Sequence, residues 1–436
     1  MRIFILPEMR EQAEEYLFSG RRAGGVSEEA IAAATEICDR VRADGFKAIK
    51  AYSKRFDSFD PQTPGDLRID PKEMKRALDK VPGRLRKALE RSIANVRAYH
   101  EAQMAHRRGF RLKMPHGVLQ ELWRPVDSAG LYVPAGAAPL ASTLIMNAVP
   151  AQVAGCTRIA TCAAPSKGGG VDPVILATAA LLGVSELYRI GGAQAIATLA
   201  YGAGVCEPVD VIAGPGNAYV VAAKMRVWGT VGIDYLSGPS EAVVLADESA
   251  DPRLVAIDLL SQAEHTGHEY CVLLTTEARL AEETSAQVEK LLASTPRRDA
   301  IESTIKTGVF CAVVAKSLRE ACELLNRIAP EHAEVVLRDA GRERRVLSSI
   351  RHVGALFIGR YSPISAGDFA VGTNHVLPTG GAARFSSPLS VDVFMKRTSI
   401  AKITKTGLAV LTGDIEAMAE AEGLPSHGAA ARERFK

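Results

Sequence analysis

The sequence contains no apolar run that approaches the roughly 20 residues a helix needs to span a bilayer. Apolar residues make up 47% of the 436 residues and charged residues 24%, a balance typical of globular proteins. The formal net charge is only +3, which is too small to indicate nucleic acid or an acidic membrane surface as a partner. We therefore expect neither membrane nor nucleic acid among the partners, and more than one domain at roughly 100–200 residues each.

The seven cysteines are odd in number, scattered and never spaced as CxxC. Most of them lie in apolar segments such as "VFCAVVA" and "YCVLLTT", where a free thiol behaves as a small hydrophobic side chain. This usage favours a reducing, cytoplasmic compartment.

From residue 131 onward, strand-like and helix-like patterns alternate at roughly 25-residue spacing, which is typical of βαβ units and a parallel sheet. Glycine clusters at 191–194 and 214–217 stand where strands turn into helices, and the free N–H groups of a helix start favour phosphate there. Short buried strands are expected at 158–163, 187–190, 209–214 and 229–234.

The same rhythm repeats in the second half of the chain. A strand is expected at 241–247, followed by a helix that opens at Asp251-Pro252 and ends at His265. Two long helices are expected earlier, over 27–44 and 83–105. The predicted fold is α/β with two Rossmann-like parallel-sheet domains: an N-terminal arm at 1–25, a discontinuous first domain over 26–130 and 238–378, a second domain over 131–237, and a C-terminal segment over 379–436.

Two polar clusters lie at the ends of predicted helices. In "LLSQAEHTGHEY" (259–270), Gln262 and His265 are spaced i, i+3 and could bind one metal ion from the same face. The alternative is a polar helix terminus at which histidine is favourable near the negative end of the dipole. Taken alone, Glu422 and His427 in "AEAEGLPSHGAAAR" (419–432) are better interpreted as part of an exposed tail.

Two further clusters lie in loops. Glu331 and His332 in "IAPEHAEVV" precede a predicted strand, and the pair could move protons near neutral pH or simply be exposed. The segment 362–388 carries Asp368 and His375 among several glycines and prolines. A structureless segment of that length in a compact domain is usually functional or disordered, and its Phe and Val content favours function.

Eight stretches in this order resemble the histidinol dehydrogenases, over nearly the whole chain. They are "LYVPAGAAPLASTLIMNAVPAQVAG" (131–155), "RIGGAQAIATLAYG" (189–202), "IAGPGNAYVVAAK" (212–224), "VGIDYLSGPSEAVVLADESADP" (231–252), "LLSQAEH" (259–265), "APEHAEVV" (329–336), "AGDFAVGTNHVLPT" (366–379) and "AEAEGLPSH" (419–427).

The resemblance implies a set of site residues. One Zn²⁺ per subunit would be bound by Gln262, His265, Asp368 and His427. The catalytic pair would be Glu331 and His332. Substrate contacts would come from Ser240, Gln262, His265, His332, Asp368, His375, Glu422 and His427. The NAD contacts would be Tyr132, Gln194 and Asn217.

The resemblance also implies an activity and an assembly. The expected reaction is the oxidation of L-histidinol through L-histidinal to L-histidine with two NAD⁺. The expected assembly is a homodimer whose C-terminal segment reaches the partner's active site, so that Glu422 and His427 would act there. The first domain would then carry the catalytic pair and most zinc ligands, and the second would bind NAD.

One departure from the family pattern leaves an alternative open. "TGHEY" follows His265 where an acidic "DP" start is commoner, and this change beside a metal ligand could suit a family paralogue that oxidises another polar alcohol, such as sulfopropanediol. Glu422 argues for a cationic amine substrate, because a carboxylate would repel a sulfonate.

Overall fold

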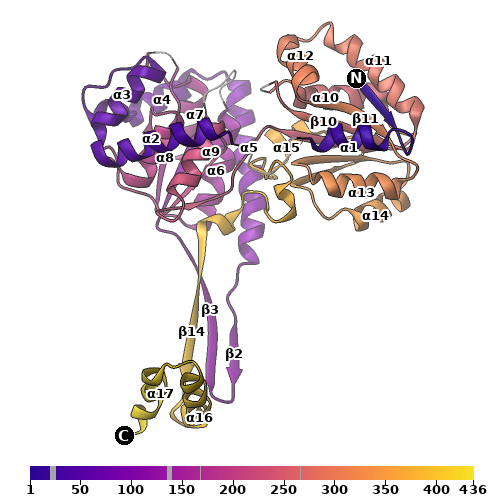
Figure 1. The fold of residues 1–436 in the computed structure, drawn as a ribbon. Coiled ribbons are helices and arrows are strands. Elements are labelled where there is room, and N and C mark those ends of the chain that lie inside the picture. The colour runs from indigo at the N-terminus through magenta and orange to yellow at the C-terminus, as the bar shows by residue number, and fades with distance from the viewer. Residues whose placement is uncertain (20–25, 135–139, 167, 266) are drawn as a thin grey trace.

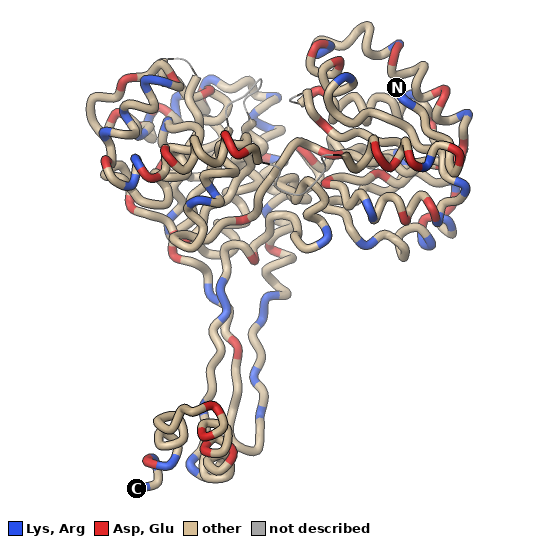
Figure 2. Tube along the Cα trace, in the orientation of Figure 1, with Lys and Arg blue, Asp and Glu red and all other residues tan. Residues whose placement is uncertain are grey.

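The computed structural model describes residues 1–19, 26–134, 140–166, 168–265 and 267–436. It has two lobes, each built on one parallel sheet, and a long stalk that carries two helices at its far end (Figure 1). Acidic and basic residues are interspersed over both lobes (Figure 2), in keeping with the small net charge. Among the described residues, no helix is both long enough and apolar enough to cross a membrane.

The first lobe, called here the five-stranded lobe, contains the parallel sheet predicted from residue 131 onward. Its strand order is β6-β5-β4-β7-β8. The strands are β4 (Ser128–Val133), β5 (Arg158–Ala163), β6 (Glu186–Tyr188), β7 (Val211–Ala213) and β8 (Gly232–Ile233). The alternating helices are α6 (Ala141–Ala154), α7 (Pro173–Leu182), α8 (Gly192–Tyr201) and α9 (Ala218–Val227).

The second lobe, the six-stranded lobe, has the strand order β1-β11-β10-β9-β12-β13, again all parallel. Its central strands are buried along their whole length, which explains their continuous apolar runs. The strands are β1 (Arg2–Ile5), β9 (Glu241–Ala246), β10 (Tyr270–Thr275), β11 (Val309–Val314), β12 (His332–Val336) and β13 (Ala355–Ile358). Its helices are α1 (Arg10–Phe18), α10 (Pro252–Ala263), α11 (Ala278–Leu292), α12 (Arg298–Thr307), α13 (Leu318–Ile328), α14 (Ala340–Ser349) and α15 (Ile364–Phe369). The predicted α/β fold with two parallel-sheet units is confirmed.

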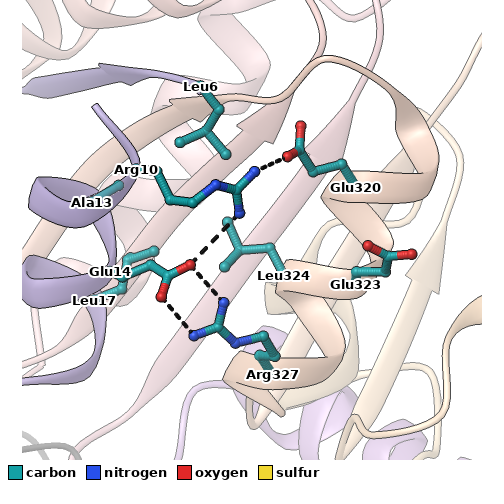
Figure 3. A pocket seen from close by; sticks show the side chains of 9 residues that line it. All are labelled: Leu6, Arg10, Ala13, Glu14, Leu17, Glu320, Glu323, Leu324 and Arg327. Carbon is teal, nitrogen blue, oxygen red and sulfur yellow. Dashed lines mark hydrogen bonds and ion pairs between the residues drawn. The ribbon is translucent and has the colours of Figure 1, made fainter. Parts of the chain in front are cut away.

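The N-terminal residues are part of the six-stranded lobe, whereas the prediction treated 1–25 as a separate arm. β1 pairs in parallel with β11 as the edge strand. A small pocket of about 80 Å³ between α1 and α13 is bridged by ion pairs of Arg10 with Glu320 and of Glu14 with Arg327 (Figure 3). None of the predicted site residues lines this pocket. We interpret it as part of the contact between α1 and α13.

The helices between residues 28 and 105 pack on the five-stranded lobe, although the prediction grouped 26–130 with 238–378. They are α2 (Glu28–Asp44), α3 (Phe46–Asp57), α4 (Pro71–Lys80) and α5 (Gly83–Ala105), with a short 3-10 turn at Pro64–Leu67. Ile37 and Val41 of α2 share a hydrophobic cluster with Ile196 of α8 and Val220 of α9. The sequence pattern predicted α2 and α5 but not α3 and α4, and apolar periodicity cannot indicate which sheet covers the apolar face of a helix.

The stalk is a three-stranded antiparallel sheet in the order β14-β3-β2. Its strands are β2 (Arg111–Met114), β3 (Gly117–Pro125) and β14 (Met395–Ile403), and it ends in α16 (Lys405–Ala421) and α17 (Pro425–Arg432). The hairpin β2–β3 was not predicted. Only Gly407 and Ala419 of α16 are buried, so the tip has little core of its own. Short 3-10 turns lie at Ala382–Arg384, Val391–Phe394 and Glu433–Phe435.

One short segment joins the two sheets. The chain leaves the carboxyl end of β8 at Ile233 and enters the amino end of β9 at Glu241. The carboxyl edge of the five-stranded sheet therefore lies beside the amino edge of the six-stranded sheet, and the two halves of the candidate site meet there.

A buried pair of carboxyl groups holds α10 against β12. Glu334 on β12 is hydrogen-bonded to Asp258 on α10 and to the backbone N–H of Ile364 at the start of α15. Burial and the neighbouring Asp258 raise the pKa of Glu334 to about 9, and burial raises the pKa of Asp258 to about 6. The pair therefore shares a proton at neutral pH and ties together three elements that carry site residues.

We expect Glu334→Gln to remove a pH-dependent loss of stability. Because the folded-state pKa is raised, the contribution of Glu334 to stability is fully present below pH 4.5 and is lost as the pH rises towards 9. The variant should match the wild type at pH 5 and exceed it by roughly 1–3 kcal/mol at pH 9. Denaturant unfolding at both pH values measures this, with exposed Glu289→Gln as the control; equal pH slopes for wild type and Glu334→Gln would contradict it.

Candidate active site

The predicted catalytic pair lies at the amino edge of the six-stranded sheet. Glu331 directly precedes β12 and His332 is its first residue, while Ser240 precedes the neighbouring strand β9. Both members of the pair are buried, with 6% of Glu331 and 4% of His332 exposed. The exposed-dipeptide interpretation is therefore wrong.

The hydrogen bond of His332 decides which of its ring nitrogens is free. Nδ1 lies 3.2 Å from the backbone oxygen of Glu241, and because a carbonyl only accepts, Nδ1 must carry the proton. Nε2 is then an unprotonated acceptor; it is buried without a hydrogen-bond partner and lies 3.7 Å from Oδ1 of Asp368. Burial lowers the pKa of His332 to about 3, so the ring is neutral and Nε2 is available as a base.

Glu331 and Glu241 are linked by reciprocal hydrogen bonds. The N–H of Glu241 donates to Oε2 of Glu331 at 3.0 Å, and the N–H of Glu331 donates to Oε2 of Glu241 at 3.2 Å. Burial, with the charges of Glu241 and Asp368, raises the pKa of Glu331 well above its usual range. The carboxylate of Glu331, once formed, is thus an unusually strong base held beside His332, whose Nδ1 is 3.6 Å away.

Gln262 and His265 stand at the end of α10, which ends at Ala263 and not at His265 as predicted. Gln262 lies in the last turn and is buried, whereas His265 follows the C-cap and keeps an open face to solvent. Burial of the rest of the ring away from water lowers the pKa of His265. The two side chains therefore do not share the helical i, i+3 geometry that the sequence indicated.

Asp368 on α15 approaches the same place from the other side. Burial raises the pKa of Asp368 to about 6, and a hydrogen bond from Gln262 opposes this rise. Because a carboxylate accepts, the amide nitrogen of Gln262 must donate, which leaves its Oε1 free as a ligand atom. The charge on protonated His265 or His375 would disfavour protonation of His332, so the three rings lie near one another.

The loop that carries Asp368 and His375 spans the two lobes. His375 donates from Nδ1 to the backbone oxygen of Asp368 at 2.8 Å, and Asn374 donates to the backbone oxygen of Met146 on α6 at 2.7 Å. Burial lowers the pKa of His375 to about 4, which keeps its Nε2 free as an acceptor. The segment 362–388 is thus not structureless, because it contains α15 and is anchored to α6 through Asn374; its functional role stays a prediction.

Glu422 and His427 lie elsewhere in this chain. Glu422 caps α16 and His427 belongs to α17, at the tip of the stalk and away from both sheets (Figure 1). Both are exposed. Of the other implied metal ligands, Gln262 is hydrogen-bonded to Asp368, and His265 lies near His332.

The predicted nucleotide contacts lie at the carboxyl edge of the five-stranded sheet. The hydroxyl of Tyr132 accepts a hydrogen bond from the N–H of Gly192 at 3.0 Å, and Gln194 follows in the first turn of α8. Asn217 is the N-cap of α9 and accepts from the N–H groups of Tyr219 and Val220. Tyr132 and Gln194 are buried and Asn217 is exposed, so only Asn217 is open to a ligand in this conformation.

The metal-binding capacity of this chain is incomplete. Among the described residues, no group of three or more His, Cys, Asp and Glu side chains is arranged to bind a metal ion. An imidazole, a carboxylate and an amide oxygen form a donor set compatible with Zn²⁺, and a second imidazole would complete four-coordination. The residues present therefore fit zinc, provided that His427 is supplied by another copy of the chain.

Glu241 is a site residue that the sequence reasoning missed. It follows Ser240 directly in the "GPSE" stretch, and its acidic side chain at the start of an apolar strand was the available signal. Its carboxylate positions Glu331, and its backbone oxygen sets the tautomer of His332.

Comparison with known proteins agrees with this geometry. The sequence model of a family described as histidinol dehydrogenase matches residues 21–435. The chain is 44% identical to the histidinol dehydrogenase of Dechloromonas aromatica, over 91% of this chain and 90% of that protein. It is 43% identical to that of Bacillus subtilis, over 94% of each. The crystal structure of histidinol dehydrogenase from Elizabethkingia anophelis superposes with a TM-score of 0.91 at 34% identity, covering 100% of this chain and 98% of that one. The chain belongs to the histidinol dehydrogenase family.

Proposed function

We propose that the protein oxidises L-histidinol through L-histidinal to L-histidine, using two NAD⁺ and a zinc ion. The observation that carries the proposal is the neutral, buried His332, whose Nε2 has no hydrogen-bond partner among the described residues and lies 3.7 Å from Oδ1 of Asp368. Membership of the family sets the reaction type, and the buried dyad supplies the groups that the reaction needs.

The metal and the cofactor would have separate places. Gln262, His265 and Asp368 would hold zinc together with His427 of a second copy, and the ion would orient the substrate and polarise the groups it binds. NAD⁺ would lie against the amino ends of α8 and α9, where free N–H groups favour its phosphates, and it would accept the hydride of each oxidation.

His332 has the tautomer that the alcohol oxidation requires. Nε2 takes the hydroxyl proton as the hydride leaves the carbon, while Nδ1 stays bonded to the oxygen of Glu241. The low pKa means that His332 is not already protonated at neutral pH. The resulting imidazolium passes its proton outward, since Nε2 must be free again before a second turnover.

Glu331 is placed for the second oxidation. Its carboxylate takes a proton from water as the water oxygen bonds to the aldehyde carbon, and the proton then passes to the former carbonyl oxygen. The hydrate that results is converted to a carboxylate by the second oxidation. The raised pKa makes Glu331 a better proton acceptor than a solvent-exposed glutamate. Burial of the pair excludes bulk water, so the aldehyde is held until it is hydrated in place.

Turnover of L-histidinol tests the proposed substrate directly. The purified protein should produce NADH with L-histidinol and with L-histidinal, and its gene should restore growth to a histidine auxotroph that lacks this step. Dihydroxypropanesulfonate is the comparison substrate, because the alternative is a paralogue acting on such an alcohol. Faster turnover of the sulfonate would overturn the histidinol proposal while leaving the dehydrogenase chemistry intact.

Substitutions in the dyad should separate the two half-reactions. His332→Asn should lower alcohol oxidation by roughly 10²–10⁴-fold because the base is lost, whereas Glu331→Gln should mainly impair oxidation of supplied L-histidinal. Single-turnover assays with each substrate measure the two steps separately. Equal loss of both steps in Glu331→Gln would contradict this division of roles.

We further propose that the active enzyme is a homodimer with an exchanged tail. The tip of the stalk exposes Val410 and Met418, and the open side of the metal site exposes Phe369 and Val371 next to Asp368. Apolar side chains on both surfaces, and a ligand set that lacks its fourth member within one chain, support a partner's α17 in this place.

Mixing two inactive variants tests this assembly. Asp368→Ala removes a ligand from the lobe and His427→Ala removes one from the tail, so each homodimer should be inactive. A mixed dimer contains one intact site, and random reassociation should restore about one quarter of wild-type activity. Mixtures of Asp368→Ala with Gln262→Ala are the control and should stay inactive, because both changes lie in the lobe. No recovery after verified reassociation of the first pair would contradict the exchange.

A further inference from the structure

A fully buried ion pair stands directly behind the proposed nucleotide turn. Lys224 on α9 is 1% exposed and Asp234, just after β8, has no exposed side-chain surface. The ammonium has three donors, and all three are used: on Asp234, on the backbone oxygen of Gly214 at 2.8 Å and on that of Tyr235 at 3.1 Å. The other carboxylate oxygen of Asp234 accepts from the N–H of Gly214 at 2.8 Å.

These contacts clamp one residue from both sides. Gly214 opens the turn at 214–217, and both its N–H and its C=O are bound by the pair. Its φ of +126° is available to glycine, and a Cβ there would lie 2.2 Å from the backbone oxygen of Tyr132. The turn therefore packs closely against β4, and it leads directly to Asn217, which is the N-cap of α9.

The same pair also holds the segment that leads to the dyad. Tyr235 and Asp234 belong to the connection between β8 and β9, which continues to Ser240 and Glu241. One buried contact therefore binds the turn on the nucleotide side and the start of the segment on the reacting side.

Stability alone is a weak reason for such a pair. Removing two charges from water costs several kcal/mol, and apolar replacements of a buried pair are often neutral or stabilising. The arrangement differs from a generic core contact because its acceptors are backbone atoms of a turn and of a connecting segment, and not of regular strands.

We propose that Lys224 and Asp234 are positioning residues that fix the 214–217 turn in the geometry that binds NAD⁺. The inference rests on the proposed function in one respect, the placement of NAD⁺ at the amino end of α9. Neither residue contacts the reacting atoms; both act through Gly214 and Asn217.

Lys224→Met, which keeps most of the side chain's volume, tests the proposal. The dissociation constant of NAD⁺, measured by calorimetry, should rise at least tenfold, and so should the KM for NAD⁺, while the KM for L-histidinol changes less than twofold. Hydrogen exchange of the amides at 214–217 should accelerate in the unliganded variant. The double variant Lys224→Met/Asp234→Leu leaves no unpaired charge, so it should fold stably and show the same loss.

Arg158→Met is the matched control. Arg158 makes a bidentate ion pair with Glu186 and donates to the backbone oxygens of Glu207 and Pro208 at the opposite edge of the same sheet. Its loss should lower the melting temperature and leave the affinity for NAD⁺ unchanged. Wild-type affinity in Lys224→Met, or an equal loss in Arg158→Met, would overturn the proposal.

The failure of the proposed function would look different. If the wild-type protein does not bind NAD⁺, the proposed function is wrong. If hydrogen exchange at 214–217 is then also unchanged in Lys224→Met, the positioning role is wrong as well. Faster exchange there would still support the clamp on Gly214.

Discussion

The reciprocal hydrogen bonds between Glu241 and Glu331 join the starts of two neighbouring parallel strands, and the candidate site depends on them. Each carboxylate accepts the first N–H of the other strand start, so neither of these buried donors is left unsatisfied. The same contact brings the backbone oxygen of Glu241 to Nδ1 of His332. The hydrogen bonds of the sheet edge thereby orient Glu331 and set the tautomer of His332.

The two sheets contribute opposite edges to the site. In open α/β sheets, ligands usually bind outside the carboxyl ends of the strands, and the proposed nucleotide-binding turns at Gly192 and Asn217 would follow that rule. The dyad instead lies at the amino ends of β9 and β12. The connection from Ile233 to Glu241 is too short to carry the chain round to the far edge. The edge proposed to bind the nucleotide therefore lies beside the edge proposed to transfer protons.

The stalk buries far fewer of its residues than the two lobes do. Eight of the nine residues of β14 are exposed, and α16 buries only Gly407 and Ala419. Such elements cannot offset their ordering entropy by burial within one chain. A second copy that covers the tip would supply the missing apolar contact and would bring His427 to the three ligands of the lobe.

The sequence by itself determined the elements whose physics is local. Apolar runs predicted β5 and β9 close to their observed positions, and the ordered motifs identified the family. The starts of α2 and α10, which Ser27 and Asp251 cap, also lie where helices were predicted to begin. Only the tertiary structure decided which partners these elements have. It placed α2 on the five-stranded lobe, paired β1 with β11, and extended β2–β3 with β14 into a stalk. Periodicity encodes which face is apolar but not what covers it. The free Nε2 of His332, the role of Glu241 and the clamp on Gly214 depend on hydrogen-bond directions between segments up to about ninety residues apart, and no local pattern carries that information.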